Sequence, residues 1–148
     1  MNNLLANTEV LRVANAAAAG QTAVASDVVD TLGYDGVTFI VAVTDMADTG
    51  VLTATAQGGA QSDGSDAADY TAAVATYTAT GAADGDAKLL AVEVFRPIHR
   101  YVRLNVVRGT ANSALDCIIA LLSKPAEAPV TQGADVLDSA SEVSPALA

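Results

Sequence analysis

The single histidine and the single cysteine, His99 and Cys117, are the residues that catalysis would use first. A thiolate beside an imidazole forms a nucleophilic pair, and both residue types bind zinc. One of each is too few for a zinc site, and Cys117 lies in an apolar run, where a thiol usually packs as a small hydrophobe. No oxyanion or orienting motif accompanies the pair. We therefore expect structural roles for both residues, no cofactor and no enzymatic activity.

Aspartates gather in the loop QSDGSDAAD, where calcium would find hard oxygen ligands. The spacing does not match an EF-hand, and no glutamate closes a loop of the EF-hand length. A solvated turn is the favoured interpretation, and a calcium site is the alternative. The candidate ligands of this loop are Asp63, Ser65, Asp66 and Asp69.

Positive charge is concentrated in residues 87–125, which hold every Lys and Arg except Arg12. In a chain of net charge −10, a cluster of arginines needs acidic partners. Pairing with carboxylates of adjacent loops is one explanation. The other is an interface, because the planar arginine fork binds carboxylates of another subunit in bidentate fashion. The arginines predicted to form this subunit interface are Arg96, Arg100, Arg103 and Arg108.

The segment YVRLNVVR predicts where two of these arginines point. Strand alternation places Arg103 on one face with Tyr101 and Asn105. Arg108 falls on the opposite face, at the end of the strand, where we expect its side chain to reach solvent.

The segment after Pro125 differs from the rest of the chain, because it has no aromatic residue and no positive charge. Such a segment cannot bury enough area to fold alone. Its apolar residues recur singly, so we expect an extended acidic arm that becomes ordered on a neighbouring subunit. The predicted apolar anchors of the arm are Val130, Val136, Leu137, Val143 and Leu147, and the last four are predicted interface residues.

Short alternating segments separated by turn residues predict the elements that carry these groups. There are about eight of them and no long helical pattern, so we predict an all-β fold, an eight-stranded jelly-roll-like β-sandwich with extended arms. The sandwich domain is expected at 8–125, the N-terminal arm at 1–7 and the C-terminal arm at 126–148. The predicted strands cover residues 8–13, 22–30, 36–45, 51–57, 70–80, 89–96, 101–108 and 114–122.

Three local predictions accompany this fold. Segment 36–45 is apolar on both faces, which is typical of a central strand, and we expect residues 37–57 to form a hairpin or meander pair. Segment 70–80 is predicted as a strand from its Thr, Tyr and Val, although its alanines also suit a helix. The run AAAAG at 16–20 is expected to be a loop rather than a helical turn.

Composition and charge exclude several classes of partner. A net charge of −10 and a pI near 4.1 argue against nucleic acid, which needs a broad cationic surface. No apolar run approaches the roughly 20 residues that span a bilayer, and the N-terminal segment lacks the features of a secretory signal. We expect an acidic monomer made in a cytoplasm, which assembles only through a specific event.

The segments RYVRLNVVRGTANSALDCIIALLSKP and DTLGYDGVTFIVAV resemble small virion proteins of tailed bacteriophages. Many of those proteins carry a (K/R)-Y-V-R strand, a short turn of Gly, Thr, Ala or Asn and a final apolar strand. Their upstream strand follows a D-T-x-G-(F/Y)-(D/E) pattern. The matching positions, Tyr101, Val102 and Arg103 together with DTLGYDGVT, are markers of fold only, and both arms are unmatched.

The resemblance implies a non-enzymatic structural role, that of a capsid cement or decoration protein. Such a protein is made in the bacterial host cytoplasm and binds the major capsid protein on the outer surface of the phage head, often as a homotrimer. A tail or head–tail connector component is the alternative. A calcium-dependent carbohydrate-binding β-sandwich is the alternative from a different class. We expect neither nucleic acid nor membrane among the partners.

Overall fold

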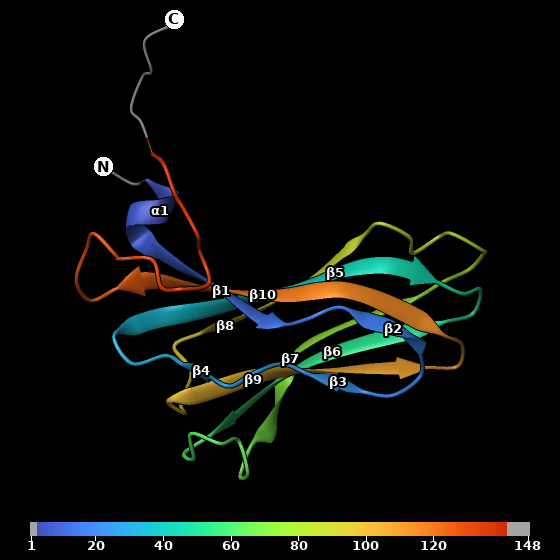
Figure 1. Ribbon diagram of the computed structural model, residues 1–148. Helices are drawn as coiled ribbons and strands as arrows, with labels where there is room; N and C mark the ends of the chain where they lie inside the picture. Colours follow the sequence, from blue (N-terminus) through green and yellow to red (C-terminus); the bar gives the residue numbers. More distant parts are fainter. Residues whose placement is uncertain (1–2, 142–148) are drawn as a thin grey trace, which may run out of the picture.

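The computed structural model describes residues 3–141, which form two antiparallel sheets packed face to face (Figure 1). Nearly every element is a strand, so the predicted all-β class is confirmed. The elements in chain order are α1 (Leu4–Asn7), β1 (Thr8–Ala14), β2 (Ala17–Gly20), β3 (Val24–Ala25), β4 (Val29–Asp30), β5 (Tyr34–Met46), β6 (Val51–Gly59), β7 (Ala68–Thr78), β8 (Leu89–Phe95), β9 (Tyr101–Gly109) and β10 (Ser113–Pro125).

The strand order is that of a jelly roll. Sheet I has the order β1-β10-β5-β8, and sheet II has the order β3-β9-β6-β7. One edge of β10 pairs with β5, and one edge of β9 pairs with β6. Strands β1 and β2 therefore share the other edge of β10, and β3 and β4 share the other edge of β9. Counting each broken pair as one strand leaves eight strands in the orders 1-8-3-6 and 2-7-4-5, two interleaved Greek keys. The predicted jelly-roll sandwich is confirmed.

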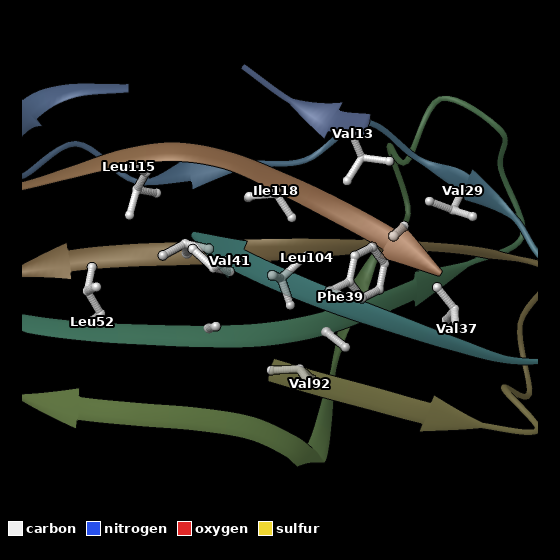
Figure 2. Packing of buried hydrophobic residues seen from close by; sticks show 14 of the residues in the cluster. Val13, Val29, Val37, Phe39, Val41, Leu52, Val92, Leu104, Leu115 and Ile118 are labelled. Atoms are coloured by element: carbon white, nitrogen blue, oxygen red, sulfur yellow. The ribbon is translucent and has the colours of Figure 1, made fainter. Parts of the chain in front are cut away.

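The core lies between the sheets and is built mainly from small side chains (Figure 2). Alternation along β5 turns Val37, Phe39 and Val41 inward, and all three are completely buried. Strand β6 contributes Leu52 and Ala54, also completely buried, as its alternation predicts. Phe39 is the largest of the fully buried side chains, so one ring anchors a core otherwise filled by valine, alanine, four leucines, Ile118 and Met46.

The predicted pairing within residues 37–57 is wrong. Strand β5 is central in sheet I, between β10 and β8, as its two apolar faces predict. Strand β6 belongs to sheet II and pairs with β7 and β9. Alternation predicts which side chains face the core but not which strand lies alongside. The prediction of a strand at 70–80 is confirmed, because β7 covers Ala68–Thr78.

The edge opposite β7 and β8 differs from the prediction in two places. Residues 17–20, expected to be a loop, form β2 because they pair with β10. Segment 22–30 is not one strand but β3 and β4, separated where Ser26 and Asp27 turn. The Ser26 N–H donates to the Leu104 carbonyl at 2.8 Å in sheet II, and the Asp27 N–H donates to the Val13 carbonyl at 2.7 Å in sheet I. This break ties the two sheets together at their edges.

Candidate assembly surfaces

Arg108 is buried, and the prediction that its side chain reaches solvent is wrong. Only 6% of the residue is exposed, because β2, the segment that follows it and the start of β10 surround the guanidinium. Its Nε donates to the Thr22 carbonyl and its Nη1 to the carbonyls of Ala18 and Ser113, each at 2.7 Å. The guanidinium therefore joins the β2–β3 crossing to the start of β10. The Nε and Nη1 donors are thus used within the fold, and an interface role for Arg108 stays a prediction.

Arg100 and Arg103 also bond within the chain, but at the surface. Arg100 binds the Asp30 carboxylate through Nε and Nη2, each at 2.8 Å, and this bidentate bond holds the pKa of Asp30 below its usual value. Arg103 lies half-buried on the outer face of β9, where its Nε donates to Gln57 Oε1 at 2.8 Å. For Arg100 the structure provides the pairing with an adjacent loop. An interface role for either arginine stays a prediction.

Arg96 and Lys124 flank an exposed aromatic ring, Phe95. The Arg96 guanidinium carbon lies 5.2 Å and the Lys124 ammonium 4.4 Å from the ring centroid, which are cation–π distances. Arg96 has a φ of +50°, and its N–H donates to the Asp35 carbonyl at 2.6 Å. Within residues 3–141, no carboxylate oxygen lies within 4.0 Å of either cationic group.

Large apolar side chains are exposed beside these cations. Leu32 is 67% exposed, Phe95 51% and Ile98 84%. The loops 31–35 and 96–100 enclose a shallow hollow of about 340 Å³ between them. Exposed large apolar side chains that gather in this way mark interaction sites. We call this surface the cationic–apolar corner and define it by Leu32, Phe95, Arg96, Ile98 and Lys124.

The tail that follows Pro125 returns to its own N-terminal segment. Gln132 is the central contact, because its Oε1 accepts the Val10 N–H at 3.0 Å while its Nε2 donates to the carbonyls of Thr8 at 2.7 Å and Leu5 at 3.1 Å. Each of these groups belongs to α1 or to the outer edge of β1. The Gln132 amide thus occupies backbone groups that would otherwise bind water or another chain.

A second contact continues the cover of this edge. Asp135 Oδ2 accepts the Arg12 N–H at 2.9 Å, and the Val130 N–H donates to the Ala6 carbonyl at 2.8 Å. Figure 1 shows the tail and α1 rising together at one end of sheet I. The sequence interpretation missed Gln132 and Asp135, since a polar residue in an acidic tail gives no sign of which backbone groups it will meet.

Two of the four predicted interface residues of the tail lie within the described residues and differ in exposure. Val136 is half-buried, and Leu137 is completely exposed. Val143 and Leu147 lie outside the described residues. The part of the tail before Val136 is ordered against the chain itself, and contact of these four residues with a neighbouring subunit stays a prediction.

The carboxylates of the 61–69 loop bond to their own surroundings. Asp66 accepts the N–H groups of Ala60 at 2.7 Å and Gln61 at 3.0 Å, and these bonds lower its pKa. Asp63 accepts a hydrogen bond from the Ser65 N–H at 2.9 Å, and Asp69 Oδ1 accepts one from Gln57 Nε2 at 2.7 Å. In residues 3–141, no three His, Cys, Asp or Glu side chains are arranged to hold a metal ion. This geometry is that of a turn stabilised by aspartates.

His99 and Cys117 line different hollows. His99 borders the cationic–apolar corner, with its Nδ1 3.3 Å from the Tyr70 hydroxyl. Cys117 is half-buried on β10, beside Ile119. Across the described residues, no helix is long and apolar enough to span a bilayer.

The fold and its surfaces define a jelly-roll protein whose exposed groups suit contact with another macromolecule. No family model and no curated protein matches the chain. Among solved structures, the chain is similar to the PBSX exported protein XepA, with a TM-score of 0.52 and 16% sequence identity. The match covers 97% of this chain and 46% of XepA, so the chain spans about half the length of that protein. At this identity the likeness shows the fold alone.

Proposed function

We propose that the chain is a non-enzymatic structural protein of a tailed-phage particle, a cement or decoration protein that binds the major capsid protein on the outer surface of the head. The cationic–apolar corner carries this proposal. The resemblance of the segments around Tyr101 and Gly33 to small virion proteins supplies the class of particle. The likeness to XepA supports the jelly-roll fold, on which the cationic–apolar corner and the resemblance to virion proteins both depend.

The chemistry of the corner indicates what the partner surface must offer. Exposed leucine, isoleucine and phenylalanine side chains lose unfavourable contact with water when a partner covers them. Arg96 and Lys124 are cations without a carboxylate within 4.0 Å in the described residues, in a chain of net charge −10. We therefore expect apolar side chains rimmed by carboxylates on the capsid surface that receives the corner.

Two other candidate functions receive less support. A tail or head–tail connector component would use the same kind of surface, and particle location separates it from a head protein. A calcium-dependent carbohydrate-binding module would need free carboxylates, whereas Asp63, Asp66 and Asp69 already accept hydrogen bonds within their own loop or from β6.

The test is binding of the purified chain to heads of the encoding phage from which this protein has been removed. We expect saturable binding to heads, and an Ile98→Asp variant should bind at least about tenfold more weakly, a loss of about 1.4 kcal/mol. Val107→Asp is the matched control, because Val107 is 45% exposed but lies on the outer face of sheet II. Binding to tails alone, or equal losses for the two variants, would overturn the proposal.

A further inference from the structure

The outer faces of the two sheets differ in character, and the strand register shows this directly. In sheet I, residues that pair across neighbouring strands form rows, and the rows that point outward run from β1 or β10 to β8. Residues between them on each strand, such as Ile118 and Val41, are buried in the core, so the rows point away from it. The rows are Arg12–Ile119–Ile40–Ala91, Val10–Leu121–Thr38–Glu93 and Cys117–Ala42–Leu89. This face is mostly aliphatic at its centre.

The outer face of sheet II has the polar composition that solvent favours. Its rows combine threonine, asparagine, glutamine and arginine, with Val74 and Val107 as scattered exceptions. The rows are Val107–Thr53–Thr76, Asn105–Thr55–Val74 and Arg103–Gln57–Asp69. An antiparallel sheet with one solvated face usually looks like this. The outer face of sheet I therefore needs a separate explanation.

We propose that the outer face of sheet I binds a second copy of this chain, face to face, about a two-fold axis parallel to the strands. Such an axis places β1 of one copy over β8 of the other. Arg12 of one copy then lies opposite the β8 end that carries Glu93 of the second copy, and the reverse pairing occurs at the other edge. The centre of the interface is formed by Ile40, Ile119 and Leu121 of both copies.

Charge favours a second copy as the occupant. Two chains of net charge −10 repel one another over most of their surface. The rows of sheet I carry Arg12 and Glu93 at opposite edges, and exposed Asp116 of β10 and Asp135 of the tail lie near Ile119. The face therefore holds only a small part of the charge of the chain, and Arg12 of one copy can meet Glu93 of the other. A symmetric interface must be self-complementary in this way.

The area of the face predicts the strength of the association. Four strands spaced about 4.8 Å apart, each about ten residues long, cover roughly 600 Å². Specific interfaces bury about 600–1,000 Å² per partner, so the face lies at the small end of that range. We expect a dimer with a dissociation constant in the micromolar range. This inference does not depend on the proposed function, because it concerns the isolated chain.

Sedimentation equilibrium of the full chain, from micromolar to millimolar concentration, tests the proposal. We expect a monomer–dimer equilibrium that Ile119→Lys weakens by at least about tenfold. Thr55→Lys, on the outer face of sheet II, is the matched control and should leave the equilibrium unchanged. Thermal unfolding of each variant shows that loss of the dimer is not loss of the fold.

A charge exchange tests the axis itself. Arg12→Glu and Glu93→Arg should each weaken the dimer, and the double variant should restore it, since Arg12 of one copy lies one row away from Glu93 of the other across the interface. Cys117, the only cysteine, lies on this face, and its alkylation should slow as concentration rises. A monomer at every concentration overturns the proposal, as does a dimer that Ile119→Lys leaves intact or that the double exchange fails to restore. Protection of Cys117 only on phage heads would assign the face to the capsid instead.

Discussion

Removing the donors of Arg108 is the sharpest test of how this fold is held together. In Arg108→Met the apolar stem is kept, but the bonds to the carbonyls of Ala18, Thr22 and Ser113 are lost. A hydrogen bond to a charged group contributes about 1.5–3 kcal/mol, so three bonds set an upper limit of about 4.5–9 kcal/mol. Part of this loss of stability is offset, because the variant no longer pays the desolvation penalty of a buried guanidinium and water can enter at the loops. We expect a net loss of about 3–4 kcal/mol.

The assay is urea unfolding of the purified variant, with native-state hydrogen exchange to locate the change. Arg103→Met is the matched control, because Arg103 lies on the same strand but makes one bond at the surface, to Gln57. The control should lose less than about 1 kcal/mol. Exchange should accelerate first in β2 and the crossing to β3. Equal losses for the two variants would refute the reasoning that the buried guanidinium fastens these segments.

Three further predictions follow from particular contacts. Gln132→Ala should cost about 1–2 kcal/mol and speed exchange of the Val10 amide, because that N–H loses its acceptor. Phe39→Ala should cost about 3–5 kcal/mol in the same urea assay, since the ring is fully buried in a core of small residues. Hydrogen bonds lower the pKa values of Asp30 and Asp66 in the folded protein below the unfolded value of 3.8. These bonds therefore stabilise the fold above pH 3.8, and the stabilisation is lost as the pH falls through the pKa values of the folded protein. Urea midpoints on both sides of pH 3.8 should show this, and Asp66→Asn should reduce the acid loss.

Much of the fold could be predicted from the sequence because alternation is a local property. The inward residues of β5 and β6 follow from the period of two, and the turn residues place the strand ends. The pairing could not be predicted in the same way. In a jelly roll, consecutive strands such as β5 and β6 lie in different sheets, and no residue in either segment records that crossing.

The partners of the arginines, like the pairing of the strands, could not be predicted from local alternation. Alternation correctly places Arg108 on the inner face of β9. Its burial depends on carbonyls at Ala18 and Thr22, which lie far earlier in the chain, and only the folded arrangement brings them to the strand end. Arg100 bonds to Asp30, which also lies far earlier in the chain. The part of the tail around Gln132, expected on a neighbour, bonds to α1 and β1 of the same chain.

The way the sheet edges end limits how copies of this chain can assemble. Open edges invite strand addition by another chain. On one side, Gln132 and Asp135 occupy N–H groups of β1, and β3 and β4 are too short to act as templates. On the other side, the register of β7 breaks between Val74 and Asp69, opposite Ala56, which bends that strand. Strand β8 is short and carries Glu93. With strand addition disfavoured at each edge, association is left to the outer face of sheet I and the cationic–apolar corner. The proposed two-fold contact through the outer face of sheet I accepts one second copy, so assembly through that face closes at the dimer instead of growing into fibres.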